Sequence, residues 1–170
     1  MGDHIIRKGH ESEIAEIMEL IARCIQVMRE GGSDQWDEHY PNAEVIGGDI
    51  AAGTLFVLDD GGAVSGIIVL DENQAEEYDA IDWSERQGPQ LIMHRLAVHP
   101  QAQGRGVARQ LIAFAERHAA EGGYASIRLD TYAKNTRALQ LYPSLGYEPR
   151  GEVYFPHRET PFPVFEKIIR

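Results

Sequence analysis

The sequence predicts an α/β (α+β) fold on three observations. Apolar residues recur at intervals of three and four in several long segments, which is the spacing of an amphipathic helix. Two apolar runs flank a glycine-rich turn early in the chain, which indicates an antiparallel β-hairpin. Further on, strand and helix patterns alternate, which implies a parallel crossover connection. We therefore expect helices together with a sheet that contains both antiparallel and parallel strand pairs.

The chain is predicted to begin with a short strand and a long helix. The strand covers residues 3–8. The helix covers residues 12–30, because apolar side chains recur at helical spacing from Ile14 to Met28 and because Gly31-Gly32 end the pattern. The apolar face of this helix is a candidate for the core.

The hairpin and the segment after it form the middle of the chain. The hairpin strands, residues 54–59 and 63–70, are joined by Asp60-Gly61-Gly62. Residues 71–88 are acidic and polar around Ile81-Asp82-Trp83, so they are predicted to make an excursion between strands with room for one helical turn. A solvated loop is the favoured interpretation of this segment.

The second half alternates strands and helices. A strand over residues 91–98 ends at His99-Pro100, because proline cannot donate a ladder hydrogen bond. Asn135 is a suitable N-cap for the last helix. The other expected elements are a helix from Val107 to Gly122-Gly123, a strand over residues 125–131, a helix from Asn135 to Gly146, and closing strands over residues 147–155 and 162–169.

Composition limits the classes of protein to consider. At 170 residues, with no repeat or linker, the chain is expected to be a single domain over residues 1–170. Its 16 Lys and Arg against 27 Asp and Glu give a net charge of -11, which argues against a nucleic-acid partner and favours a cationic one. The single cysteine, Cys24, permits no intramolecular disulfide. We expect a cytoplasmic protein without a membrane partner, because no signal peptide or spanning segment is evident.

The segment Val98–Ala108 is the most informative for function, because it lies between a predicted strand end and a predicted helix start. Glycine lets main-chain amides approach a ligand closely, and a helix N-terminus adds unsatisfied donors, so this segment is suited to a diphosphate. A plain turn that starts a helix is the alternative. A dinucleotide-binding loop lacks its third glycine here, and a Walker loop lacks its Gly-Lys-Ser/Thr ending.

Two motifs lie in the second half of the chain. Gln103, Gly106 and Ala108 fit the pattern Gln/Arg-x-x-Gly-x-Gly/Ala. Further on, the chain fits the block Asn-x-x-Ala-x-x-Leu-Tyr-x-x-x-Gly-Phe/Tyr with Asn135-Thr136-Arg137-Ala138-Leu139-Gln140-Leu141-Tyr142, followed by Leu145-Gly146-Tyr147. Both motifs resemble those of the GNAT superfamily of acetyl-CoA-dependent N-acetyltransferases. The resemblance covers residues 91–150 and implies a mixed, mostly antiparallel central sheet flanked by helices.

The resemblance also implies a site for acetyl-CoA as co-substrate. Main-chain groups of Leu96 and Val98 would pair with the pantetheine arm, Asn135 would contact the cofactor while capping its helix, and Ala138 would leave room for pantetheine. The residues implied at the pyrophosphate are Gln103, Gly104, Arg105, Gly106, Val107 and Ala108. Four nearby cations, whose alternative role is that of a solvated helix charge, could meet the phosphates: Arg105, Arg109, Lys134 and Arg137.

Tyr142 is implied as the general acid that protonates the coenzyme A thiolate; its alternative role is a packed aromatic beside Leu141 and Leu145. An amine with a pKa near ~10 must also lose a proton. His94 is a candidate base because it precedes the loop and because histidine as a residue type titrates near neutral pH. Strand alternation also places His94 with Leu96 and Val98 on one face, so a buried structural histidine is equally natural. Lesser candidates for the base are Asp130, Glu152, His157 and an ordered water.

Residues 34–41 combine aromatics and carboxylates in a predicted loop, so Trp36 and Tyr40 are candidates to bind the acceptor's ammonium by cation-π contact. A tryptophan packed in a connector is the alternative for Trp36. The seven histidines show no metal-ligand spacing, so no metal is expected. The predicted function is acetyl transfer to a primary amine of a small molecule or peptide by direct attack. A non-catalytic acyl-CoA-binding module is the alternative, and a homodimer is implied by resemblance only.

Overall fold

The computed structural model describes residues 4–169, and the first residue of the strand predicted at 3–8 lies outside this range. The chain divides into two compact units. Unit 1 contains the described residues up to Leu70 together with Arg95–Ala115, and unit 2 contains Asp71–His94 and the described residues from Glu116 onward.

The chain forms a mixed, mostly antiparallel sheet with helices, as predicted. The strand order is β1-β2-β3-β4-β5-β7-β6, and β4 contributes residues to both units. The strands are β1 (His4–Lys8), β2 (Leu55–Asp60), β3 (Ala63–Asp71), β4 (Gln90–Val98), β5 (Ser126–Asp130), β6 (Glu148–Val153) and β7 (Phe162–Ile168). The α-helices are α1 (Ile14–Glu30), α2 (Ala43–Ala51), α3 (Val107–Glu121) and α4 (Thr136–Ser144), and the 3-10 turns are η1 (Glu11–Glu13), η2 (Glu76–Ala80) and η3 (Pro100–Ala102).

In unit 1, β1, β2 and β3 form an antiparallel meander. The predicted hairpin is confirmed: Asp60 pairs with Ala63, so Gly61 and Gly62 are the two turn residues. Their φ angles of 64° and 100° lie in the left-handed region that a tight hairpin of this type requires.

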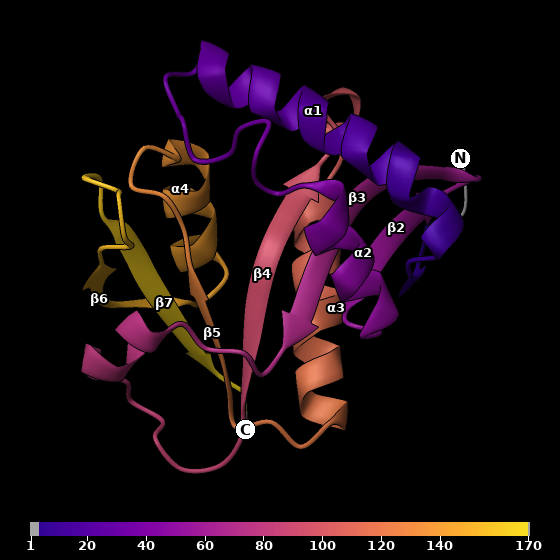
Figure 1. Ribbon diagram of the computed structural model, residues 1–170. Coiled ribbons are helices and arrows are strands. Elements are labelled where there is room, and N and C mark those ends of the chain that lie inside the picture. Colours follow the sequence, from indigo (N-terminus) through magenta and orange to yellow (C-terminus); the bar gives the residue numbers. More distant parts are fainter. Residues whose placement is uncertain (1–3, 170) are drawn as a thin grey trace. The chain divides into compact units, whose positions relative to one another are not determined.

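Helices pack on both faces of this meander (Figure 1). On one face, buried residues of α1 and α2 join those of β2 and β3 in one apolar cluster, which includes Ile17, Ile46 and Ile67. On the other face, α3 comes so close that a Cβ at Gly66 would lie 2.9 Å from Leu111 and Val107. The first turns of α3 are therefore fixed against β3 by tight packing.

Unit 1 differs from the sequence prediction in two places. Residues 12 and 13, predicted as the start of the long helix, belong to η1 (Glu11–Glu13), and the backbone amide of His10 donates to Glu13 Oε1 at 2.8 Å. Helix α2 was not predicted. Asn42 caps it by accepting from the Val45 amide at 2.9 Å, and the pair Gly47-Gly48 inside it weakens the sequence signal, because glycine is a poor helix former.

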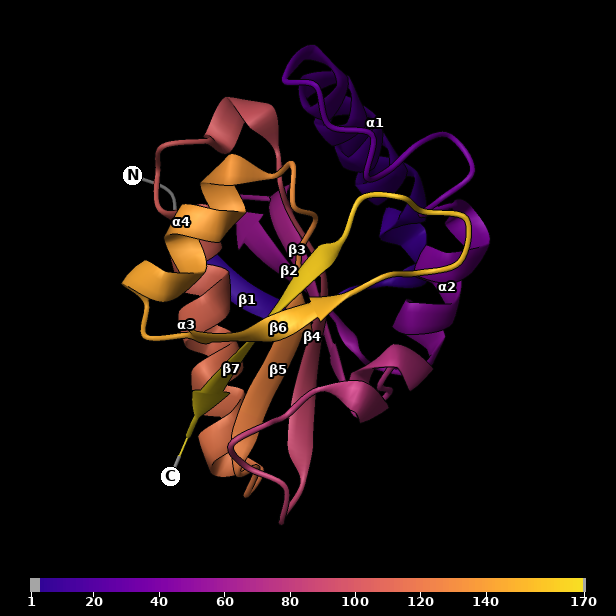
Figure 2. The same ribbon diagram turned by 90° about the vertical axis from the view of Figure 1, so that its left-hand side faces the viewer.

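In unit 2, β5 pairs in parallel with β4 and antiparallel with β7, and β6 pairs with β7. Figure 2 shows the β6 and β7 pair, with α4 as a short helix between β5 and β6 in the chain. The ladder between β4 and β5 consists of three pairs, from Gln90↔Ser126 to Ile92↔Arg128. Within the described residues it therefore ends two positions before His94.

The prediction of a solvated loop at residues 71–88 is wrong. Tyr78, Ile81 and Trp83 are buried in one apolar cluster with Ile92 and residues of β7. The indole Nε1 of Trp83 donates to the Tyr78 carbonyl at 3.0 Å, which satisfies its polar atom inside the core. Residues 71–88 therefore pack onto the core of unit 2, and η2 is the helical turn within them.

Candidate functional site

The segment between β4 and α3 in unit 1 has the backbone of an anion-binding loop. Gly104 and Gly106 have φ angles of 82° and 78°, and a Cβ at either position would meet nothing within 4 Å. Glycine is therefore needed for the conformation and not for space. The amides of Val107 and Ala108 begin α3, where a helix has no intrahelical acceptors for its first N–H groups. An open glycine turn followed by free helix donors fits a diphosphate.

The end of β4 is braced from two sides. The Val98 carbonyl accepts from Cys24 Sγ at 3.3 Å and from Gln103 Nε2 at 3.4 Å. Gln103 thus ties the loop to the strand that precedes it. Burial raises the pKa of Cys24 to about 11, although its hydrogen bond to Val98 acts in the opposite direction, so the thiol remains protonated at neutral pH. This environment does not suit a nucleophile.

Of the two aromatics proposed for the acceptor, Trp36 is only 5% exposed and packs in the apolar cluster of unit 1, whereas Tyr40 is 44% exposed. The Tyr40 hydroxyl accepts from Arg95 Nη1 at 2.9 Å. Arg95 also forms two 2.8 Å hydrogen bonds with the carboxylate of Asp49 on α2. This arrangement holds the segment before α2 against β4.

Sequence reasoning did not single out Arg95. Its φ of 47° is left-handed, which is uncommon for a residue with a side chain. The predicted alternation of His94, Leu96 and Val98 on one strand face is interrupted at this residue: Leu96 is half-buried, and the next two residues are both buried. No pattern of residue types in the sequence predicts this interruption of the strand alternation.

In unit 2, Tyr142 lies on α4 and is 6% exposed, with its ring centroid 5.7 Å from that of Tyr147 and 5.8 Å from that of Phe165. Burial, and secondly the charge of Asp130, raise the pKa of Tyr142 well above the usual range of a phenol. The hydroxyl therefore keeps its proton at neutral pH. A packed aromatic can accordingly also serve as a proton donor.

Asp130, at the end of β5, is close enough to Tyr142 to influence its ionisation. Tyr78 donates its hydroxyl to Asp130 Oδ2 at 2.7 Å. Burial raises the pKa of Asp130, while the Tyr78 hydrogen bond and the charge of His94 partly oppose this shift. His94 Nε2 in turn lies 2.8 Å from Asp71 Oδ1. The structure thus gathers two predicted base candidates and the predicted acid in one cluster, the Tyr142–Asp130–His94 cluster of unit 2.

The remaining predicted residues lie elsewhere. Asn135 caps α4 as predicted, since its Oδ1 accepts from the Ala138 amide at 3.1 Å. Glu152 on β6 and His157 in the turn before β7 are both exposed. Among residues 4–169, no three His, Cys, Asp or Glu side chains form a group that could hold a metal ion.

Comparisons with known proteins agree with this geometry. The acetyltransferase (GNAT) family model matches residues 15–147. A GNAT-family acetyltransferase structure from Streptococcus agalactiae has a TM-score of 0.85 at 29% identity, covering 97% of this chain and 95% of that one. The yncA protein of Salmonella typhimurium, solved with its cofactor acetyl-CoA, has a TM-score of 0.72 at 16% identity and coverages of 99% and 95%.

A shorter match is found with N-acetyltransferase 8B of Rattus norvegicus, which is 34% identical over 67 residues. That match covers 39% of this chain and 30% of the rat protein, well under two thirds of its length.

The chain belongs to the acetyltransferase (GNAT) family, whose model matches most of its length. That family is one of acetyltransferases. In the described part of the chain, no helix is long and apolar enough to cross a membrane.

Proposed function

We propose that this chain is an N-acetyltransferase that moves the acetyl group of acetyl-CoA to a primary amine of a small molecule or peptide. The amine attacks directly in a ternary complex. The observation that carries the proposal is Tyr142, a buried phenol that keeps its proton and lies beside Asp130. A buried protonated donor is what a departing thiolate requires.

The co-substrate would be held through the main chain. Amides of the segment from Gln103 to Ala108 would bind the pyrophosphate, as the two left-handed glycines and the start of α3 support. Two of these amides, those of Gln103 and Arg105, also donate within the loop, to the carbonyls of Pro100 and Ala102. Main-chain groups of Leu96 and Val98 would pair with pantetheine, and Asn135 and Ala138 would line its path. The side chains of Arg105 and Arg109 would add charge to the phosphate contacts.

In the proposed reaction, the neutral amine nitrogen forms a bond to the thioester carbonyl carbon. The carbon–sulfur bond then breaks, and the sulfur leaves with the electron pair of that bond and takes the proton of Tyr142. The proton lost by the acceptor's ammonium goes to His94, whose imidazole lies in the same cluster as Asp130. After the attack the nitrogen carries one proton more than the amide product does, and this second proton restores the phenol of Tyr142. The net reaction therefore releases one proton, the one taken up by His94, to solvent.

A cationic acceptor is supported by the net charge of -11 and by the carboxylates around His94. Tyr40 is proposed as an aromatic contact for the acceptor, because it is exposed and held by Arg95. Trp36 is proposed to support this contact from the core. The same charge supports the absence of a nucleic-acid partner.

We further propose that residues 1–170 act as one domain, since the family match runs through segments of both units. The single buried cysteine supports a cytoplasmic location. A homodimer is kept as a proposal that sedimentation can test.

The decisive experiment is a panel of amines incubated with acetyl-CoA. Free thiol release would be followed, and the product would be identified by mass spectrometry. We expect amine-dependent thiol release and an N-acetylated product, with cationic amines preferred. Calorimetric binding of coenzyme A without turnover of any amine would instead favour a non-catalytic acyl-CoA-binding module.

A further inference from the structure

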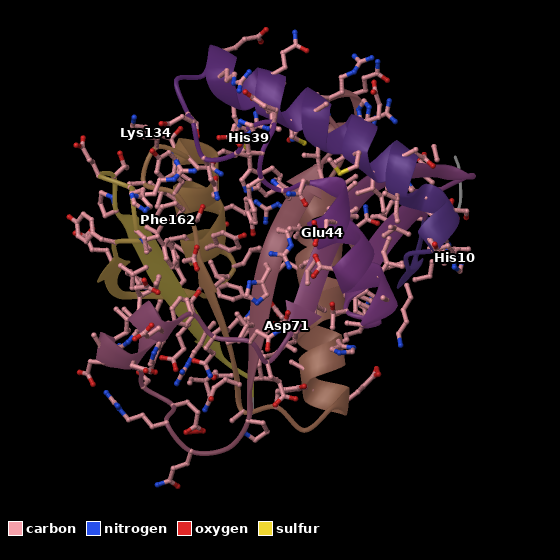
Figure 3. The ribbon with its side chains drawn as sticks, in the orientation of Figure 1. His10, His39, Glu44, Asp71, Lys134 and Phe162 are labelled. Carbon is pink, nitrogen blue, oxygen red and sulfur yellow. The ribbon has the colours of Figure 1, made fainter. Side chains whose placement is uncertain are left out.

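Asp71 is held rigidly at the end of β3 (labelled in Figure 3). Its side chain is 11% exposed, and that of His94 is 24% exposed. The Asn73 amide donates to Asp71 Oδ1 at 2.9 Å, in an Asx turn that follows the strand directly. The aspartate therefore does not depend on His94 for its orientation.

The same oxygen also faces His94. His94 Nε2 lies 2.8 Å from Asp71 Oδ1, which already accepts the Asn73 amide hydrogen. The oxygen of an ionised carboxylate can only accept hydrogen bonds, and after accepting the amide hydrogen it still has a second lone pair. His94 Nε2 must therefore be the donor of the 2.8 Å contact.

This contact fixes the tautomer of the imidazole. A neutral imidazole carries a single N–H, so a proton on Nε2 leaves the lone pair on Nδ1. If Nδ1 takes a proton, the imidazolium lies beside the Asp71 carboxylate, and Asp130 is near enough to interact with its charge. Carboxylates of β3 and β5 therefore interact with this imidazole, and Glu77 on η2 acts in turn on Asp130.

The position of His94 in the strand suits a reacting group. The pairing of β4 with β5 ends at Ile92, so His94 lies in a part of β4 that the β5 ladder does not use, within the described residues.

We propose that Asp71 is a positioning residue that holds His94 as the Nε2–H tautomer and so makes Nδ1 the atom that accepts the proton of the acceptor amine. The inference rests on the proposed acetyl transfer to an amine. It adds a residue, Asp71, and a specific atom, His94 Nδ1, that the resemblance to the family did not supply.

The first test uses the wild-type protein and does not depend on activity. Two-bond ¹H–¹⁵N spectra of labelled protein report the tautomer of each histidine, and the signals of His94 are assigned by their loss in His94→Gln. We expect the Nε2–H pattern for His94 at neutral pH. An Nδ1–H pattern would overturn the inference even if the enzyme acetylates amines.

The second test uses kinetics. Asp71→Asn should lower kcat for the amine by roughly 10- to 100-fold, with the KM for acetyl-CoA unchanged, because an oriented ligand or base loses about that much without its partner. Asp71→Glu, which keeps the carboxylate, should restore part of the rate. Glu72→Gln is the matched control: its carboxylate accepts the Tyr124 hydroxyl at 2.8 Å and not an imidazole, so kcat should stay near that of wild type.

A double variant separates positioning from plain structural support. Asp71→Asn combined with His94→Gln should be no slower than His94→Gln alone, because the two residues act as one unit. Additive losses would contradict the proposal. If His94→Gln keeps the wild-type kcat while the amine is still acetylated, His94 is not the base and the inference fails, but the proposed function stands. If wild type acetylates no amine of the panel, the proposed function fails.

Discussion

The loop before α3 and the Tyr142–Asp130–His94 cluster use opposite means to prepare for a ligand. The loop relies on the main chain: two exposed glycines with left-handed φ angles and the free amides of a helix start. The cluster relies on side chains, and burial raises the pKa values of two of them, Tyr142 and Asp130. The comparison indicates that binding a diphosphate needs only backbone geometry, whereas proton transfer needs burial and specific pairs.

The largest effect is expected in the cluster. Tyr142→Phe removes the proton donor and leaves the ring contacts, so kcat should fall by about 10²- to 10⁴-fold, the usual range for a general acid. Affinity for acetyl-CoA, measured by calorimetry, should be unchanged. Tyr154→Phe, at a residue that is 56% exposed, is the control and should leave kcat unaltered. An unaltered rate in Tyr142→Phe would remove its acid role.

The second effect concerns stability and the Arg95 contact in unit 1. Both side chains of the Arg95–Asp49 pair are about 15% exposed, so Arg95→Ala leaves a buried carboxylate without its partner. We expect a loss of about 3 kcal/mol in the free energy of unfolding, measured with urea. Arg23→Ala breaks the exposed pair with Glu19 and should cost less than about 0.5 kcal/mol. If Arg95→Ala and Arg23→Ala lose the same free energy of unfolding, burial of the Arg95–Asp49 pair does not add to stability.

The third effect tests the loop itself. Gly106→Ala places a side chain at φ 78°, which should cost about 1 kcal/mol of stability and weaken acetyl-CoA binding by at least about tenfold. Gly123→Ala is matched to it: its φ is 77° and its surroundings are equally open, but it lies at the other end of α3. Gly123→Ala should therefore lose a similar amount of stability and bind acetyl-CoA as tightly as wild type does. If both variants bind acetyl-CoA equally, the loop does not hold the diphosphate.

The smallest effect is a pH dependence of stability. The pKa of Asp130 is raised in the folded state, chiefly by burial, so the folded protein binds this proton more tightly than the unfolded chain. Stability from this group is therefore lost as pH rises from the ordinary pKa through the raised one. Asp130→Asn, which keeps an acceptor for Tyr78, should stabilise the protein more at pH 7 than at about pH 4.

An opposite sign is expected at an exposed carboxylate. The hydrogen bond from Arg86 lowers the pKa of Asp82, so its contribution is present at neutral pH and is lost in acid. Asp82→Asn should therefore give a small loss at pH 7 that disappears on acidification. If the stability changes caused by Asp130→Asn and Asp82→Asn vary with pH in the same direction, this account of the cluster is contradicted.

The sequence predicted what depends on local chemistry. The turn at Gly61-Gly62, the Asn135 cap and the loop around Gly106 each follow from a few neighbouring residues, and the structure has the turn and the cap as expected. The contacts of Tyr78 with Asp130 and of Asp71 with His94 join residues 52 and 23 positions apart. Such pairs depend on how the elements pack, and no spacing rule reveals them.

The most direct test of the central claim is a single-turnover reaction with the best acceptor amine, quenched at intervals and analysed by intact-mass spectrometry. Direct attack predicts that N-acetylated amine appears in step with free coenzyme A and that the protein itself never gains an acetyl group. An acetylated protein that forms before the product, or thiol release without any acetylated amine, would contradict the account.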